Sequence, residues 1–174
     1  MDTKGQIVAL FLAVKYSKDP VEAVIFSDEE KEGKGSKHFN PKKKYKGAIV
    51  LEPTDFSICI AQAGSIEVNL KIKGKEAHGA LPICGENAIE TLFSLYQDLK
   101  KLDHLKNSHP LFPPPYVNIG YIKGGIDCQI IPEECLAQIE ISILPNMDFK
   151  KVSKDFFKIL KKYNAHYKII NLDP

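Results

Sequence analysis

The feature that most constrains the fold is a change of hydrophobic period that recurs between residues 65 and 171. Apolar and polar side chains alternate over residues 65–73 and 135–144, which predicts two half-buried strands, and residues 117–123 read as a third. Residues 87–102 and 149–163 instead place apolar side chains at helical spacing, and residues 166–171 read as a last short strand. This order predicts a β-α-β-β-α-β, or ferredoxin-like, arrangement.

The first 63 residues follow a different pattern. Residues 5–18 predict a buried helix, and residues 34–39 predict a short one. Residues 21–26 and 48–51 are continuous apolar runs, which are typical of parallel strands covered on both faces. Two strands cannot complete such a sheet. We therefore predict a mixed chain: a partial parallel α/β segment over residues 1–63, then a ferredoxin-like α+β domain over residues 64–174.

The charge, the cysteines and the apolar runs of the sequence limit which partners and which cellular location can be expected. The 24 lysines and arginines against 22 acidic residues give a formal net charge of +2, too small to indicate nucleic acid as the main partner. The four cysteines form no C-x-x-C pair and suggest no disulfide framework, so a reducing cytoplasm is expected. The apolar run at residues 7–14 is far shorter than the roughly 20 residues that span a bilayer. We expect no membrane partner.

Acidic residues follow the apolar runs of the first segment. Glu29 and Glu30 come after the first run and Glu52 after the second, while Asp2 precedes the first helix. Ligands gather at the carboxyl ends of strands in open α/β sheets, where clustered carboxylates could hold two divalent metals. A further carboxylate could act as general base. Acidic residues after strands are common, however, so this spacing alone leaves both a metal site and a solvated surface open.

Six motifs, in order along nearly the whole chain, resemble those of the M20 metallopeptidase and deacylase family. That family includes acetylornithine deacetylase and succinyl-diaminopimelate desuccinylase. Three of the motifs lie in the first 63 residues: D-T-K-G at residues 2–5, S-D-E-E with the later glycines at 27–35, and L-E-P-T at 51–54. The other three lie in the ferredoxin-like part: G-K-E-A-H-G-A-L-P at 74–82, G-E-N-A-I at 85–89, and Y-V-N-I-G-Y-I-K-G-G with the following I-I-P at 116–132.

The resemblance implies a catalytic α/β domain with two zinc ions, or cobalt, and an inserted ferredoxin-like lid that forms a homodimer. Asp2 would bridge the two metals, and Glu30 and Glu52 would each bind one. Glu29 would be the general base. His78 would reach the active site of the partner subunit and hydrogen-bond the oxyanion. Asn87 and Gln129, which stand in lid motifs, would contact the substrate.

The implied reaction is hydrolysis of an amide bond in an N-acyl amino acid or a small peptide. The family's H-x-D motif and its last histidine ligand have no counterpart in residues 1–174, and His38, His104, His109 and His166 match no ligand motif. We therefore expect this chain to be a truncated part of the enzyme that is not active alone. Ser142 stands where many members have an arginine, which leaves the substrate open. The alternative is a non-catalytic dimerisation or binding module derived from the lid.

Overall fold

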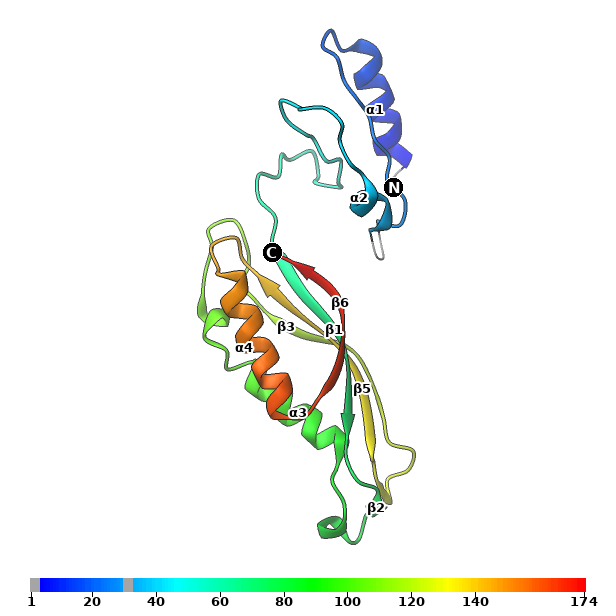
Figure 1. Ribbon diagram of the computed structural model, residues 1–174, viewed down its shortest axis with the longest axis vertical. Helices are drawn as coiled ribbons and strands as arrows, with labels where there is room; N and C mark the ends of the chain where they lie inside the picture. Colours follow the sequence, from blue (N-terminus) through cyan, green and yellow to red (C-terminus); the bar gives the residue numbers. More distant parts are fainter. Residues whose placement is uncertain (1–3, 30–32) are drawn as a thin grey trace. The chain divides into compact units, whose positions relative to one another are not determined.

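The computed structural model describes residues 4–29 and 33–174. The chain divides into two units, Met1–Ile60 and Ala61–Pro174, and each is described here by itself (Figure 1). The second unit has the ferredoxin-like arrangement that the sequence predicts, so the mixed α/β class is confirmed.

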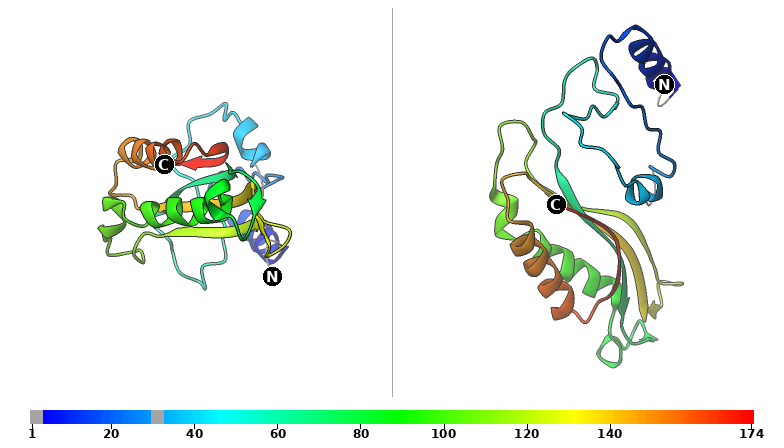
Figure 2. Two further views of the ribbon diagram at one scale, coloured as in Figure 1. Left: turned by 90° about the horizontal axis from the view of Figure 1, so that it is seen from below. Right: turned by 45° about the horizontal axis from the view of Figure 1, so that its top comes forward.

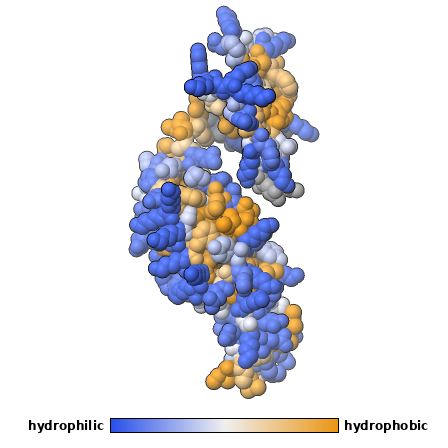
Figure 3. Space-filling model, viewed as in Figure 1, coloured by the Kyte–Doolittle hydropathy of each residue, from blue (hydrophilic) through white to orange (hydrophobic). Residues whose placement is uncertain are grey.

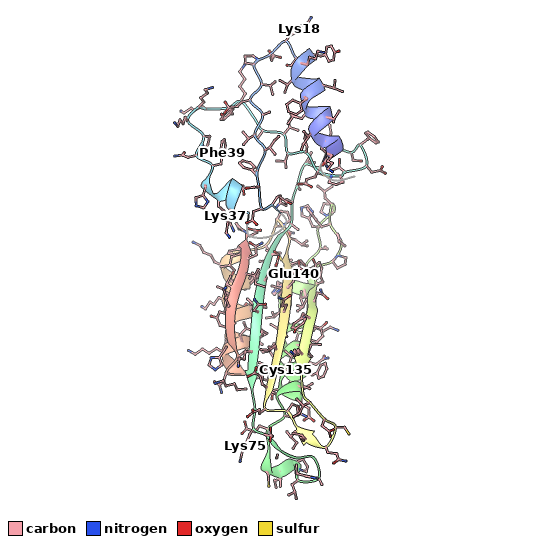
Figure 4. All side chains as sticks on the ribbon, turned by 90° about the vertical axis from the view of Figure 1, so that its right-hand side faces the viewer. Lys18, Lys37, Phe39, Lys75, Cys135 and Glu140 are labelled. Carbon is pink, nitrogen blue, oxygen red and sulfur yellow. The ribbon has the colours of Figure 1, made fainter. Side chains whose placement is uncertain are left out.

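The second unit is built on a four-stranded sheet in the order β3-β5-β1-β6. Its strands are β1 (Gly64–Lys73), β3 (Val117–Gly124), β5 (Glu134–Ile143) and β6 (His166–Asp173), and all neighbours are antiparallel. Figure 4 looks onto the open face of this sheet, with Cys135 and Glu140 marking β5. Two short strands, β2 (Ala77–His78) and β4 (Ile130–Ile131), form a separate ribbon at one end.

Two helices cover the other face of the sheet, α3 (Ala88–Leu99) and α4 (Phe149–Lys162) (Figure 2). The alternating side chains of β1 and β5 meet the apolar stripe of each helix, because a period of two and a period of 3.6 each place apolar residues on one side. Two short 3-10 helices, η1 (Pro82–Cys84) and η2 (Asp103–Lys106), lie in the loops. The fully buried core includes Ile66, Val68, Leu92, Leu95, Ile139, Ile141, Phe156 and Leu160.

The aspartate Asp98 ties the two helices together. Its carboxylate accepts hydrogen bonds from Lys162 Nζ at 2.6 Å and from the Tyr163 hydroxyl at 2.7 Å, and Lys101 approaches at 3.1 Å. The hydrogen bond from Lys162, followed by that from Tyr163, holds the pKa of Asp98 well below its usual range. The end of α3 is thereby fastened to the end of α4.

The first unit contains two helices, α1 (Lys4–Tyr16) and α2 (Lys34–His38). The predicted parallel strands are wrong here: within residues 4–29 and 33–60 no strand forms, and residues 21–26 and 48–51 have no regular secondary structure. The side chain of Ile49 is 89% exposed and that of Val50 is 79% exposed. A strand of a parallel sheet needs neighbouring strands to pair with, and the described part of this unit supplies none.

The helix α1 forms as predicted, but the prediction that it is buried is wrong. None of its residues is buried, and Phe11 is 62% exposed. Ile7, Leu10 and Val14 are half-buried, whereas Val8, Phe11 and Leu12 are exposed. Within the described parts of the chain, no helix has the length and apolar character needed to cross a bilayer.

The Asp98 contacts predict how stability depends on pH. A carboxyl group with a depressed pKa in the folded state contributes stability that is present above its unfolded pKa, about 4. That stability is lost as the pH falls through the folded pKa. We expect Asp98→Asn to lower the urea midpoint of unfolding at pH 7 and to lower it less at pH 3.

The matched control for this prediction is Asp103→Asn. The side chain of Asp103 is 93% exposed and pairs with Lys106 inside η2, so solvent screens the pair. We expect a smaller change in the midpoint at pH 7. Equal midpoint shifts for Asp98→Asn at pH 7 and pH 3 would contradict the assignment.

Candidate functional site

The ribbon of β2 and β4 brings two of the predicted lid residues together. His78 lies opposite Ile130 in the ribbon, and the next residue, Gly79, donates its N–H to the carbonyl oxygen of Gln129 at 2.6 Å. A Cβ at position 79 would lie 2.9 Å from that oxygen, so the close approach requires glycine. His78 and Gln129 are thus held at the same end of the sheet, as neighbours across the ribbon.

The imidazole of His78 is exposed and has a defined hydrogen bond. The backbone N–H of Ala80 donates to His78 Nδ1 at 3.1 Å. A ring nitrogen that accepts a hydrogen bond carries no proton, so the neutral ring holds its proton on Nε2. This arrangement leaves the Nε2–H of His78 able to donate to a group outside the ribbon.

The loop before α3 is fixed by backbone pairing. Lys75 and Glu86 exchange N–H···O bonds of 2.8 and 2.9 Å, and Gly74 donates to the Glu133 carbonyl oxygen at 2.7 Å. A Cβ on Gly85 would lie 2.9 Å from the Ala77 Cβ, so the loop packs directly on β2. The segment that carries His78 is therefore held by both the loop and the ribbon.

Asn87 is the N-cap of α3. Its Oδ1 accepts hydrogen bonds from the N–H groups of Ile89 at 3.0 Å and Glu90 at 3.2 Å, and its Nδ2 donates to Glu90 Oε1. This is an asparagine N-cap, and Glu90 at the third helical position braces the side chain of the cap rather than its backbone N–H. The sequence reasoning used this asparagine for substrate and missed the cap. Contact between Asn87 and substrate stays a prediction.

The predicted metal ligands are placed only in part. Asp2 and Glu30 lie outside the described residues. Glu29 is exposed in a turn that is closed by hydrogen bonds from Gly33 N–H to Asp28 O at 2.8 Å and from Gly35 N–H to Ser27 O. Glu52 is exposed in a segment without regular secondary structure.

The described residues do not form a zinc site. Within residues 4–29 and 33–174, no group of three histidine, cysteine, aspartate or glutamate side chains is placed to hold a metal ion. Zinc also favours nitrogen and sulfur ligands, whereas the two described acidic candidates offer only oxygen.

The open face of the sheet carries a polar row that the sequence reasoning did not identify. Across the four strands, Asn171, Glu67, Glu140 and Asn118 lie side by side. The Tyr116 hydroxyl donates to Glu140 Oε1 at 2.9 Å, and burial together with this hydrogen bond raises the pKa of Tyr116. Alternation within β1 and β5 predicts a polar face, but the neighbours in the row follow only from the register between strands.

Ser142 has a structural hydrogen bond in this sheet. Its side chain is buried, and its Oγ accepts the N–H of Tyr116 at 2.8 Å. Where an arginine would present a cation for a substrate carboxylate, this position presents a hydroxyl that already has a partner. The row two residues along β1 and β5 carries the carboxylates of Glu67 and Glu140.

Comparison with known proteins matches this architecture. The model of the family described as Peptidase dimerisation domain, M20_dimer, matches residues 60–168. An uncharacterized metallohydrolase of Methanocaldococcus jannaschii is 31% identical, over 97% of this chain and 49% of that protein. Acetylornithine deacetylase of Myxococcus xanthus is 31% identical, over 88% of this chain and 43% of that protein. The chain spans about half the length of the curated relatives it matches.

Among solved structures, one assigned as an aminohydrolase of methicillin-resistant Staphylococcus aureus has a TM-score of 0.50 and 19% identity, over 64% of this chain and 30% of that one. This likeness concerns the fold alone. The family model, by contrast, matches more than half of the present sequence, and the sequence relatives extend over nearly all of it. The chain therefore belongs to the M20 metallopeptidase and deacylase family, and residues 60–168 are its dimerisation domain.

Proposed function

We propose that this chain is the dimerising lid, with part of the catalytic domain, of a metal-dependent enzyme that hydrolyses amide bonds. The substrate is an N-acyl amino acid or a small peptide, and the metal of the complete enzyme is zinc or cobalt. The observation that carries the proposal is the state of His78: an exposed ring, fixed at Nδ1 by the Ala80 N–H, with Nε2–H left as a donor. Family membership and the named relatives support the reaction class.

A neutral histidine with a free N–H suits the stabilisation of an oxyanion. Negative charge develops on the carbonyl oxygen as the amide is attacked, and a positioned donor lowers the energy of that state. The ribbon and the preceding loop limit the movement of His78, so its donor is already oriented before the reaction begins. We propose that His78 donates this bond in the active site of the partner subunit of a homodimer.

The remaining predicted roles belong to the same proposal. Glu29 takes a proton from the attacking water and passes it to the leaving nitrogen. Asp2, Glu30 and Glu52 stay predicted metal ligands, and Asn87 and Gln129 stay predicted substrate contacts. The bond from the Gly79 N–H to the carbonyl oxygen of Gln129, which holds Gln129 at the same end of the sheet as His78, supports this role. A cytoplasmic location also stays a prediction.

A non-catalytic dimerisation module is the second candidate. It is favoured by one observation: the described part of the first unit forms no strand and, like the rest of the described chain, contributes to no three-ligand metal group. Such a module would associate with itself but would not turn over an N-acyl amino acid. Activity of the full-length protein that contains this chain separates the two candidates.

The role of His78 is tested by His78→Ala in that full-length protein. Removal of one oxyanion donor lowers kcat by about 10²–10³-fold. We expect this loss in kcat for the hydrolysis of N-acetyl amino acids, with a much smaller change in KM.

The matched control is His109→Ala. His109 has the same local hydrogen bond, because its Nδ1 accepts the N–H of Leu111 at 3.2 Å, but it lies in the loop before β3. We expect this variant to keep its kcat. If both histidine variants lose activity equally, or if His78→Ala keeps full activity, the assigned role of His78 is wrong.

The two roles of Asn87 can be separated by two substitutions. Asn87→Ala removes the cap and lowers stability by about 1 kcal/mol, whereas Asn87→Asp keeps a good cap. If the amide of Asn87 also contacts substrate, Asn87→Asp raises KM about tenfold, while the lost bond to Glu90 lowers Tm only slightly because both groups are exposed. Asp148→Asn, which alters the equivalent cap of α4, serves as the control. A wild-type KM for Asn87→Asp would leave Asn87 with the capping role alone.

A further inference from the structure

A groove runs along α4 on the helix-covered side of the second unit. Its volume is about 690 Å³, which is within the range of ligand-binding clefts. Side chains of α4 line one wall, and the end of α3, η2 and the turn before α4 line the other. Its apolar part includes Val152, which belongs to the core, and the half-buried side chains of Leu102, Met147 and Ile159. The groove therefore offers a partner apolar surface.

The surface around the groove is strongly basic. Residues 98–107 and 146–162, which contain both walls, hold nine lysines and four aspartates, whereas the whole chain has a formal net charge of +2. Six of these lysines belong to α4, and all six are exposed. Figure 3 shows the hydrophilic surface over α4. The excess positive charge of the chain is thus concentrated on this side of the second unit.

The acidic residues of the groove leave part of this charge unpaired. Asp148 caps α4, where its carboxylate accepts two backbone N–H groups of the first turn. Asp103 pairs with a lysine of η2 at 2.8 Å. The third acidic residue, Asp155, lies on α4 between Lys151 and Lys158, and within residues 4–29 and 33–174 none of these three side chains forms a salt bridge. Two lysines of the groove therefore remain available to an anionic partner.

The lysines of α4 are placed where they repel one another. Lys150, Lys154, Lys158 and Lys162 follow at intervals of four residues, and like charges at that spacing destabilise a helix. Lys150 also stands in the first turn, where the helix dipole disfavours a positive charge. Of these four, Lys162 alone has an ionic partner in the described parts of the chain, which is Asp98. Carboxylates from outside the chain would relieve the repulsion.

We propose that this groove binds an acidic amphipathic segment of a partner protein. Carboxylates of the segment pair with Lys151 and Lys158, and one of its apolar side chains covers Ile159. Acidic side chains four residues apart on a helix are separated by about 6 Å along its axis, and the lysines of α4 have the same spacing. The apolar part of the groove favours such a segment over a bare polyanion, which has no apolar group to place there.

Two other anionic partners fit the groove less well. A lipid bilayer would meet only lysines, because the apolar residues of α4, such as Phe156 and Leu160, are fully buried and cannot insert. A nucleic acid would find cations for its phosphates, but its bases are read most often by arginine, and the sequence contains no arginine. We therefore assign the groove to a protein segment.

Fluorescence anisotropy with the chain of residues 1–174 tests the inference. The probe is a labelled helical peptide that has glutamates four residues apart and leucines on the adjoining face. We expect it to bind with a Kd of about 10–100 µM, and a lack of binding at about 1 mM would overturn the inference. The double substitution Lys151→Gln with Lys158→Gln should raise this Kd at least tenfold.

The matched control for charge is the double substitution Lys73→Gln with Lys168→Gln. It removes the same charge from exposed positions on β1 and β6. We expect this control to leave the Kd within about twofold of the wild-type value, because exposed charges farther away than a Debye length are screened. Equal weakening by the two double variants would show that only the net charge matters, and the assignment to the groove would be wrong.

Ile159→Gln tests the apolar contact. We expect it to raise the Kd about fivefold or more, whereas Phe93→Gln, at a 52% exposed position of α3 outside the groove, should not change it. Circular dichroism checks that each variant is folded. If Ile159→Gln unfolds the second unit, a peptide with serines in place of the leucines decides. It should bind the wild-type chain about fivefold more weakly, and equal binding would contradict the apolar contact.

Competition identifies the class of partner. Inorganic polyphosphate and phosphatidylserine vesicles should displace the labelled peptide less well, per negative charge, than the unlabelled peptide does. If either displaces it better, the groove serves another anion and the inference is wrong. None of these outcomes bears on the proposed hydrolysis, because α3 begins beside the His78 ribbon and the groove lies at the other end of that helix.

Discussion

The antiparallel pairing of β1 with β5 is the constraint on which the rest of the second unit depends. Ten consecutive residue pairs join these two central strands, from Gly64 with Ile143 to Lys73 with Glu134. The pairing turns Ile66, Val68, Ile139 and Ile141 toward α3 and α4, where apolar burial stabilises the fold. It also fixes both ends of the sheet. One end carries the His78 ribbon, and the two flanks carry β3 and the free edge of β6.

The local sequence pattern predicts most of the second unit, because the buried side chains of its strands and helices recur every two or every three to four residues. The alternation in β1 and β5 and the helical spacing in α3 and α4 fix the order of elements, and their bounds lie close to those expected. The first unit shows the limit of this reasoning. An apolar run such as residues 48–51 becomes a parallel strand only beside strands that are distant in sequence, and those partners do not enter a local pattern. The predicted strands there are consequently wrong.

The candidate site also has features that the sequence could predict and features that it could not. Pattern and resemblance select His78 and Gln129, and the ribbon places them side by side, but their chemical roles depend on groups beyond the described residues. Neither the proton position on His78 nor the capping bonds of Asn87 can be derived from periodicity, since both follow from backbone geometry within a few residues. The row of Glu67 and Glu140 depends on the register between strands. That register places the two carboxylates side by side on the open face of the sheet.

We propose that His78 completes an active site across a dimer, and one mixing experiment tests this role directly. In the full-length protein, Glu29→Gln and His78→Ala are each expected to be inactive. If His78 acts in trans, each heterodimer holds one site with Glu29 from one chain and His78 from the other. Because half of the dimers in an equal mixture are heterodimers with one intact site of two, about a quarter of the wild-type activity should return. If the mixture stays as inactive as the separate variants, although heterodimers form, His78 does not act in the partner's site.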